Sequence, residues 1–110
     1  MRIVSWNCCL KLAAKYDHVA QLKPDILIVQ ECEQLPSDFF PEAHYHWVGH
    51  DKKKGLGALT FDEKAEIDPS FNPNLDYFLP LTFESGLKLL GVWSFTHRAE
   101  KRFGVGLASP

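Results

Sequence analysis

Asn7 and Glu31 are the residues whose types and spacing first suggest chemistry. Asn7 follows a short apolar run at residues 3–6, and Glu31 comes directly after an apolar run at 26–29 and one glutamine. An amide oxygen and a carboxylate are hard donors, which suit a small hard cation such as Mg²⁺. If both runs are parallel strands, their polar ends share the sheet edge where open α/β proteins place ligands. These residues alone leave open that Asn7 caps a turn and Glu31 is a solvated carboxylate.

The elements that must position this pair can be predicted from the segment between the two runs. Apolar residues recur there with the spacing of one helix face, at Leu12, Tyr16, Val19 and Ala20. Pro24 ends the helix, because proline lacks an amide hydrogen and disfavours helical geometry in the preceding residue. Four consecutive apolar residues at 26–29 are typical of a strand buried on both faces. Residues 1–32 are therefore predicted to form a right-handed βαβ unit, whose helix-opening amides favour an anion such as phosphate.

Two short motifs resemble those of a known superfamily. Trp6-Asn7 ends the first predicted strand, and Gln30-Glu31 ends the second, which the sequence KPDIL introduces at residues 23–27. This pairing resembles the endonuclease/exonuclease/phosphatase superfamily, which includes exonuclease III-like and DNase I-like nucleases, deadenylases and inositol polyphosphate 5-phosphatases. The resemblance implies that Asn7 supports the active site and that Glu31 is a metal ligand. On this basis we predict a site for Mg²⁺ or Mn²⁺ held by Glu31 and Asn7, with both residues catalytic.

The same resemblance sets the expected fold. It implies a mixed α/β fold, in which two sheets pack face to face with helices outside as a four-layer α/β/β/α sandwich of the DNase I-like type. The superfamily's second half carries a Gly-Asp-x-Asn motif and a terminal Asp-His motif, and neither occurs in this sequence. We therefore expect residues 1–110 to be a single partial domain, the N-terminal half of such a sandwich.

His97 is the third candidate catalytic residue. It ends a strong strand pattern at residues 87–96, where a histidine is more often structural than catalytic when judged by its position alone. Ser94-Phe95-Thr96-His97 resembles the segment of the DNase I-like and phosphatase branches whose histidine lies close to the scissile phosphate. This implies a catalytic His97 and favours those branches over abasic-site repair. Arg98 follows at once and is expected to contact the substrate.

A lysine-rich turn is the other candidate for substrate binding. Residues 51–57 are predicted to form the turn of a hairpin, with Lys53 and Lys54 at its tip. These lysines are either a solvated hairpin end or a phosphate-contacting loop. The sequence GLGALTF that contains the turn's end resembles the superfamily's strand after a glycine-rich turn. Farther along, residues 78–83 are predicted as an edge strand, because Pro80 cannot donate to a central ladder.

Composition narrows the class of protein. A chain of 110 residues is one domain or part of one, and 45% hydrophobic residues suffice for a core. The net charge of −2 gives no general attraction for nucleic acid, so such binding needs a local patch. No apolar run has the length of a membrane span and no leader pattern is present, so we expect a cytoplasmic protein with no membrane partner.

Cysteines and histidines offer an alternative metal chemistry. Three cysteines with one adjacent pair, Cys8, Cys9 and Cys32, do not suit a disulfide framework. His44, His46 and His50 would share a face of a strand. A zinc-binding domain built on these histidines or on the cysteines is therefore a rival hypothesis, although neither set has the usual ligand spacing.

The activity that follows is metal-dependent hydrolysis of a phosphoester, in particular a phosphodiester, in nucleic acid or a small phosphorylated molecule. We expect the isolated chain to be inactive or nearly so. One helix cannot cover both faces of a large sheet, so we also expect an apolar face that the rest of a longer enzyme or self-association covers. The alternative is a non-catalytic binding or assembly module derived from the same fold.

Overall fold

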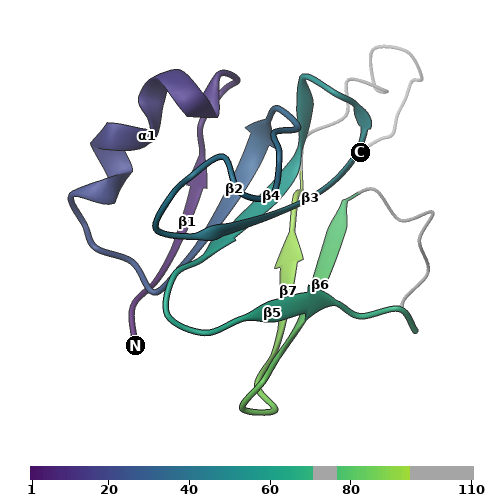
Figure 1. Ribbon diagram of the computed structural model, residues 1–110. Helices are drawn as coiled ribbons and strands as arrows, with labels where there is room; N and C mark the ends of the chain where they lie inside the picture. The colour runs from purple at the N-terminus through teal and green to yellow at the C-terminus, as the bar shows by residue number, and fades with distance from the viewer. Residues whose placement is uncertain (71–76, 95–110) are drawn as a thin grey trace.

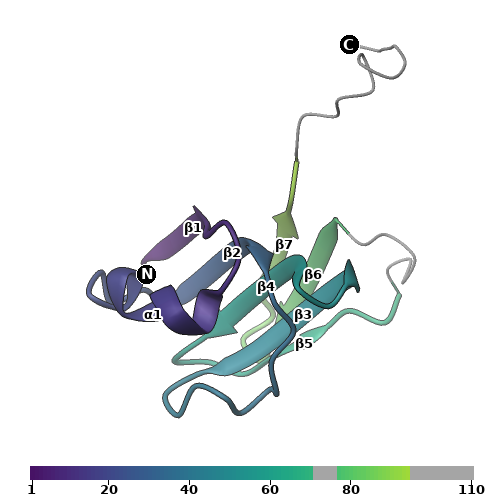
Figure 2. The same cartoon turned by 90° about the horizontal axis from the view of Figure 1, so that it is seen from above.

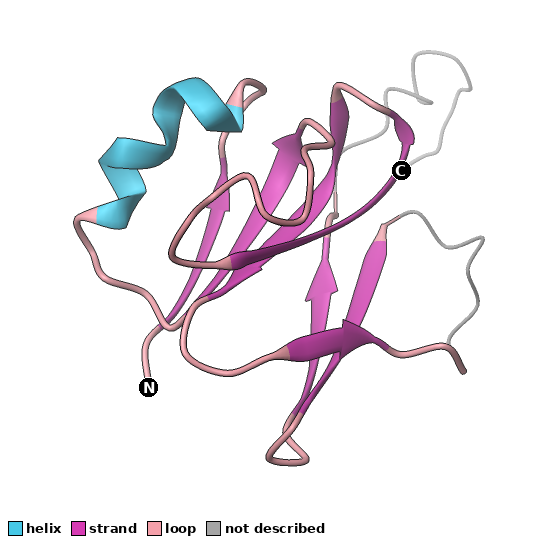
Figure 3. Cartoon of the chain, viewed as in Figure 1, coloured by secondary structure: helices cyan, strands magenta, loops and turns pink. Residues whose placement is uncertain are grey.

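The computed structural model describes residues 1–70 and 77–94, and strands dominate them (Figures 1 and 3). A single described helix follows the first strand, as its apolar period predicts. In chain order the elements are β1 (Ile3–Asn7), α1 (Leu12–Ala20), β2 (Ile26–Cys32), β3 (His44–Asp51), β4 (Lys54–Thr60), β5 (Ala65–Ile67), β6 (Phe78–Phe83) and β7 (Lys88–Val92).

The predicted βαβ unit and hairpin are both present in the first sheet. β1 pairs in parallel with β2, so that Ile3 lies opposite Ile26 and Asn7 lies opposite Gln30. β4 pairs antiparallel with β2, and β3 pairs antiparallel with β4 through the lysine-rich turn. The strand order is β1-β2-β4-β3. The carboxyl ends of β1 and β2 therefore meet at one edge of the sheet, as the sequence predicts.

β2 is buried on both faces, which explains its unbroken apolar run. Leu27 and Val29 pack in one core with residues of α1, whereas Ile26 and Ile28 pack in a second core with residues of β6. Burying a side chain of this size stabilises a fold by roughly 1.5–3 kcal/mol. The result is three layers, α1, the four-stranded sheet and a second sheet, which Figure 2 shows from above.

The second sheet has the order β5-β6-β7, so the strand with Pro80 is central and the prediction of an edge strand is wrong. Pro80 lies opposite Leu90 of β7, and its carbonyl accepts a hydrogen bond from the amide of Asp68. The amide and carbonyl of a strand residue point to the same neighbour. The missing amide of Pro80 therefore points past Ile67, the last residue of β5, where no ladder bond is needed.

The outer face of the second sheet is only partly covered by the described residues. Leu90 is 47% exposed and Val92 is 42% exposed on β7. The described helix lies on the first sheet, so the described part has three layers, and the four-layer sandwich stays a prediction. β7 also ends at Val92, short of the strand predicted for residues 87–96. No helix in the described ranges has the length and apolar character needed to cross a membrane.

Candidate functional site

Asn7 and Glu31 meet at the carboxyl ends of β1 and β2. The side-chain amide of Asn7 donates from Nδ2 to Oε2 of Glu31 over 3.2 Å. Asn7 is exposed, and Glu31 is half-buried. The structure thus brings together the two residues that the sequence singled out, at a solvent-accessible sheet edge.

A β-bulge directs Glu31 toward Asn7. The pairing with β4 shifts between Gln30, which lies opposite Leu56, and Cys32, which lies opposite Gly55, so Glu31 is the extra residue. Its φ of 58° lies in the left-handed region, which costs a residue with a side chain about 1–2 kcal/mol. Bulges of this kind re-aim side chains and recur next to functional sites.

Asn7 is held from both ends of its side-chain amide. Its Oδ1 accepts a hydrogen bond from the backbone amide of Cys9 over 3.1 Å, and its Nδ2 faces Glu31. The thiol of Cys9 also lies on this amide oxygen, with its Sγ 3.5 Å from Oδ1. Asn7 is therefore placed to orient the carboxylate of Glu31.

The start of α1 does not offer an open anion site, contrary to the expectation that its amides face a phosphate. The amides of Leu12 and Ala13 donate to the carboxylate of Glu33 over 2.7 and 3.0 Å. Lys11, at the N-cap position, makes no side-chain capping bond. The protein's own carboxylate thus takes the place that the helix dipole would offer to a ligand anion.

Two aromatic side chains of β3 support the end of β2. The hydroxyl of Tyr45 donates to the carbonyl of Glu33 over 2.7 Å, and the indole of Trp47 donates to the carbonyl of Cys32 over 3.0 Å. Gly57 leaves room for this contact, because a Cβ there would lie 2.7 Å from the Tyr45 hydroxyl oxygen. The glycine-rich turn seen in the sequence therefore makes space for side chains under the site.

The lysine-rich turn lies at the same end of the first sheet as Glu31. Lys54 begins β4 next to Gly55, the partner of Cys32, and its ammonium lies 6.0 Å from the ring centroid of Trp93. Trp93 directly follows β7. The backbone amide of Lys53 donates to the carboxylate of Asp51 over 2.9 Å. The side chain of Lys53 is exposed at the hairpin tip.

Gln30, next to Glu31, connects three strands. Its side-chain amide donates to Oγ of Ser5 over 3.0 Å and to the carbonyl of Val92 over 3.3 Å. The end of β7 is therefore tied to β1 and β2. The segment that follows β7 starts beside the candidate site, whereas His97 and Arg98 themselves lie outside the described residues.

The cysteines differ in their surroundings. Cys8 and Cys32 are buried and Cys9 is exposed, and all three are free thiols. Burial is the main cause that raises the pKa of the Cys8 thiol, and it raises the pKa of the Cys32 thiol to about 12. Both buried thiols therefore stay protonated at neutral pH, which does not suit a metal-binding thiolate.

The histidines of β3 show no shared metal geometry. Nε2 of His46 lies 3.4 Å from Oγ1 of Thr60, and burial, followed by the nearby His44, lowers the pKa of the His46 ring. Within residues 1–70 and 77–94 no group of three or more His, Cys, Asp or Glu side chains is placed to hold a metal ion. The described part of the chain gives the zinc hypothesis no support.

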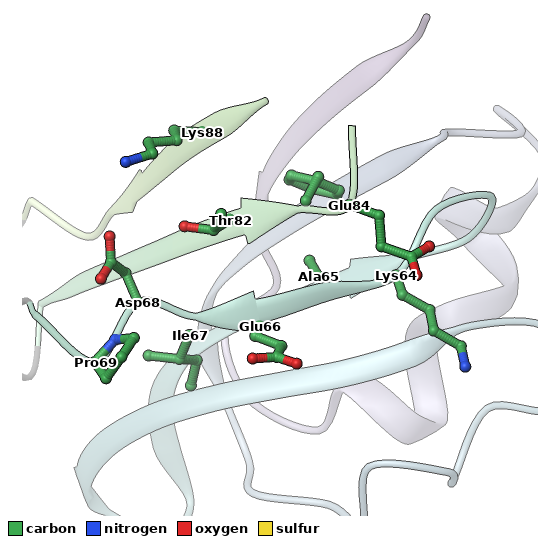
Figure 4. Close-up of a pocket in the computed structure, with 10 residues that line it drawn as sticks. Lys64, Ala65, Glu66, Ile67, Asp68, Pro69, Thr82, Glu84 and Lys88 are labelled. Carbon is green, nitrogen blue, oxygen red and sulfur yellow. The ribbon is translucent and has the colours of Figure 1, made fainter. Parts of the chain in front are cut away.

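A separate hollow lies on the second sheet, between β5 and β6 (Figure 4). Its volume is about 450 Å³, and its walls carry two lysines and three carboxylates, Lys64, Lys88, Glu66, Asp68 and Glu84. Neither Asn7 nor Glu31 lines this hollow. With a mixed and slightly acidic lining, this hollow does not favour a phosphate group.

Several supporting residues could not be found from the sequence. These residues act through hydrogen bonds to backbone groups of other elements, and they are Glu33, Tyr45, Trp47 and Lys15. The signal that was visible is the pair of glycines at 55 and 57, whose missing side chains leave room for the two aromatic rings. Their role appears only once the pairing of β3 with β4 is known.

Comparison with known proteins gives a likeness in structure. No family model matches the sequence, and no curated protein matches it. A solved structure of an AP endonuclease from Archaeoglobus fulgidus matches with a TM-score of 0.56 and 19% sequence identity. The two chains share a fold. The match covers 84% of this chain and 40% of that chain, so this chain spans well under half the length of the structure that it resembles.

At 19% identity this likeness concerns the fold alone. A mixed α/β fold of the nuclease type is what the resemblance of the two strand-end motifs implies. The prediction of a mixed α/β fold is thereby supported, whereas the roles of individual residues, the metal and the activity stay predictions.

Proposed function

We propose that the edge formed by Asn7 and Glu31 belongs to the active site of a metal-dependent phosphoesterase. The observation that carries the proposal is the bulge, which holds Glu31 in a left-handed conformation and presents its carboxylate to Asn7. A strained carboxylate at the end of a parallel strand is a feature of functional sites. The shared fold with a structure described as an AP endonuclease supports a nuclease-type activity.

The donor set fits weak binding of Mg²⁺ or Mn²⁺. Mg²⁺ keeps several waters and is commonly held by one or two carboxylates together with substrate phosphates. Glu31 supplies one carboxylate, with Oε2 hydrogen-bonded to Asn7 and Oε1 left for the ion. When bound, such an ion draws charge from phosphate oxygens and lowers the pKa of bound water. That Asn7 also ligates the metal stays a prediction.

The remaining residues contribute substrate contacts in this proposal. Lys53 and Lys54 bind the phosphate from the hairpin tip, and Arg98 binds it from the segment after β7. His97 donates a hydrogen bond to the phosphate or assists the leaving oxygen. The substrate is a phosphodiester in nucleic acid or a small phosphorylated molecule. With so few ligands on this chain, turnover by the isolated chain is negligible, and the complete site needs further residues.

Paramagnetic Mn²⁺ tests the proposal on the chain itself. In ¹H–¹⁵N spectra, added Mn²⁺ broadens the signals of residues around Asn7 and Glu31 first, because the effect falls steeply with distance from the ion. Glu31→Gln abolishes this broadening. Glu42→Gln is the matched control, since it removes a carboxylate that accepts a bond from Tyr16 and lies outside the site. Broadening centred on His44 and His46, or unchanged in Glu31→Gln, overturns the proposal.

Where a longer protein contains this domain, activity is tested in that protein. Glu31→Ala there removes most metal-dependent turnover of a phosphodiester, while Glu42→Ala leaves it near the wild-type rate. Equal turnover in the two variants contradicts the assignment of Glu31.

A second candidate function is a non-catalytic binding or assembly module. The exposed apolar residues Leu90 and Val92 on the outer face of the second sheet favour it, because apolar faces on soluble domains are commonly covered by a partner. Sedimentation of the chain at increasing concentration distinguishes the candidates. Association that Val92→Lys abolishes, without Mn²⁺ binding at Glu31, supports the assembly module, which also makes a homo-oligomer the expected state.

A further inference from the structure

The loop between β1 and α1 is strained over three consecutive residues. Cys9, Leu10 and Lys11 have φ values of 54°, 75° and 62°, all in the left-handed region. This conformation is unfavourable for a residue with a side chain. A loop of this kind persists only where its surroundings hold it in place.

Two opposite charges hold the loop at its two ends. The ammonium of Lys15 donates to the carbonyls of Cys8 and Cys9 over 2.7 and 3.2 Å. The carboxylate of Glu33 accepts the amides of Leu12 and Ala13 over 2.7 and 3.0 Å. Hydrogen bonds to charged groups are stronger than those between neutral groups, so together these bonds offset the strain of the loop.

The loop in turn contacts both residues of the candidate site. The amide of Cys9 donates to Oδ1 of Asn7 over 3.1 Å, which fixes the side-chain amide whose Nδ2 faces Glu31. The amide of Leu10 donates to the backbone carbonyl of Glu31 over 2.8 Å. A change in the loop therefore moves the donor that orients the Glu31 carboxylate.

Glu33 is itself firmly anchored. It follows the bulge by two residues, and its carbonyl accepts the hydroxyl of Tyr45. Its side chain thus ties the start of α1 to the end of β2, while its backbone is held to β3 by Tyr45.

We infer that Glu33 is a positioning residue for the site, because its carboxylate holds the strained loop that orients Asn7 against Glu31. The expected effect of Glu33 on metal affinity rests on the proposed function. The expected effect of Glu33 on the Asn7 side chain does not. Groups that orient metal ligands typically change metal affinity about 10–100-fold when they are replaced.

The experiment uses the full chain with Glu33→Gln and Glu33→Ala. The glutamine keeps one accepting oxygen and loses the charge, so it remains folded where the alanine fails to fold. Glu63→Gln is the matched control, because the Glu63 carboxylate also accepts a backbone amide, that of Ser85, beside the second sheet. Three quantities are measured in each variant: the free energy of unfolding, the ¹⁵N-resolved side-chain amide signal of Asn7, and the affinity for Mn²⁺.

We expect Glu33→Gln to shift and broaden the Asn7 side-chain signal and to weaken Mn²⁺ binding about tenfold. Glu63→Gln leaves both unchanged at a comparable loss of stability. An unchanged Asn7 signal in Glu33→Gln overturns the inference and leaves Glu33 as a helix cap alone. A wild-type chain that does not bind Mn²⁺ at Glu31 contradicts the proposed function, whereas the Asn7 signal still decides the role of Glu33.

Discussion

Cys32 occupies the core position on the α1 side that Glu31 would occupy if β2 were a regular strand. Leu27 and Val29 face that core, and in an alternating strand the next inward residue is number 31. The bulge inserts Glu31 as an extra residue, so that Cys32 fills the core and the carboxylate is released. A buried apolar core and an accessible acid are thereby obtained from consecutive residues.

Two substitutions of Glu31 separate the backbone strain at the bulge from the metal binding by its carboxylate. Glu31→Ala and Glu31→Gly both remove the carboxylate, but only glycine adopts a φ of 58° without strain. We expect Glu31→Gly to exceed Glu31→Ala by about 1 kcal/mol in the free energy of unfolding, measured with urea. Both variants lose Mn²⁺ binding. Equal stability of the two variants would show that the left-handed conformation is not strained.

Asn7→Asp places a second carboxylate against Glu31. Without a metal, two like charges at this distance repel, so we expect a lower midpoint of thermal unfolding than in the wild type. With millimolar Mn²⁺ the second carboxylate becomes a ligand, and the midpoint rises more than in the wild type because the ion binds the folded state preferentially. Calorimetry with and without Mn²⁺ measures both effects. Asn7→Ala is the control, for which the added ion raises the midpoint least.

The fold could be predicted from the sequence where the apolar residues of a segment recur with the spacing of one helix face or form one strand-length run. The parallel pairing of β1 with β2 follows from two apolar runs separated by an amphipathic helix, and the hairpin follows from the turn after Asp51. The prediction that Pro80 lies in an edge strand is wrong, because proline is excluded only where its missing amide hydrogen would have to bond to a neighbouring strand. That condition depends on how far β5 extends, which the sequence does not give.

The pair at the site was predictable because it lies at strand ends, but its geometry was not. The bulge at Glu31 depends on the register between β2 and β4, a non-local quantity. The role of Glu33 depends on a contact with residues about twenty positions earlier. Long-range hydrogen bonds of this kind leave no local pattern, because the residue type alone is equally typical of a solvated surface.

Thiol chemistry gives an independent check on the surroundings of the site. Cys9 is exposed, whereas Cys8 and Cys32 are buried with pKa values raised mainly by burial. We expect one cysteine to react rapidly with a maleimide at neutral pH in the native state and three to react in urea. Because Sγ of Cys9 lies 3.5 Å from Oδ1 of Asn7, the labelled protein also binds Mn²⁺ more weakly. Mass spectrometry of peptides identifies the labelled residue, and rapid labelling of Cys32 would contradict the structure.

Stability should fall at alkaline pH. Burial raises the pKa of Cys32 from 9.0 to about 12, and burial followed by Glu42 raises the pKa of Tyr16 from 10.0 to about 12. Both groups keep their protons in the folded state after the unfolded state has lost them, so the free energy of unfolding decreases as pH rises. The contribution of Cys32 is complete below about pH 9 and that of Tyr16 below about pH 10, and both are lost toward about pH 12.

Urea unfolding at a series of alkaline pH values measures this decrease. Tyr16→Phe removes the phenol and flattens the curve above about pH 10, since a phenylalanine binds no proton in either state. An identical slope in the wild type and in Tyr16→Phe would show that the hydroxyl of Tyr16 is not held protonated by the fold.

A substitution of Gly57 tests whether the space beside Tyr45 is needed for its hydrogen bond to the carbonyl of Glu33. A Cβ at position 57 would lie 2.7 Å from the Tyr45 hydroxyl oxygen and 2.8 Å from the Sγ of Cys32. We expect Gly57→Ala to lower the free energy of unfolding by roughly 1–3 kcal/mol through overpacking. Gly91→Ala is the milder comparison and is expected to cost less, because its Cβ would lie 3.3 Å from a methyl group of Ile28 that needs to move only slightly.

The double variant Gly57→Ala with Tyr45→Phe tests whether the hydroxyl of Tyr45 causes the loss of stability. Removing the hydroxyl relieves only the 2.7 Å contact, because the ring carbon Cε1 of residue 45 and the Sγ of Cys32, both 2.8 Å from the new methyl group, remain. Alanine at position 57 is therefore expected to cost less in this background than in the wild type. The difference between the two costs is the coupling energy of the pair. If the two costs are equal, the hydroxyl of Tyr45 is not the group that clashes, and its contact with Glu33 should then survive in Gly57→Ala with an unchanged Asn7 side-chain signal.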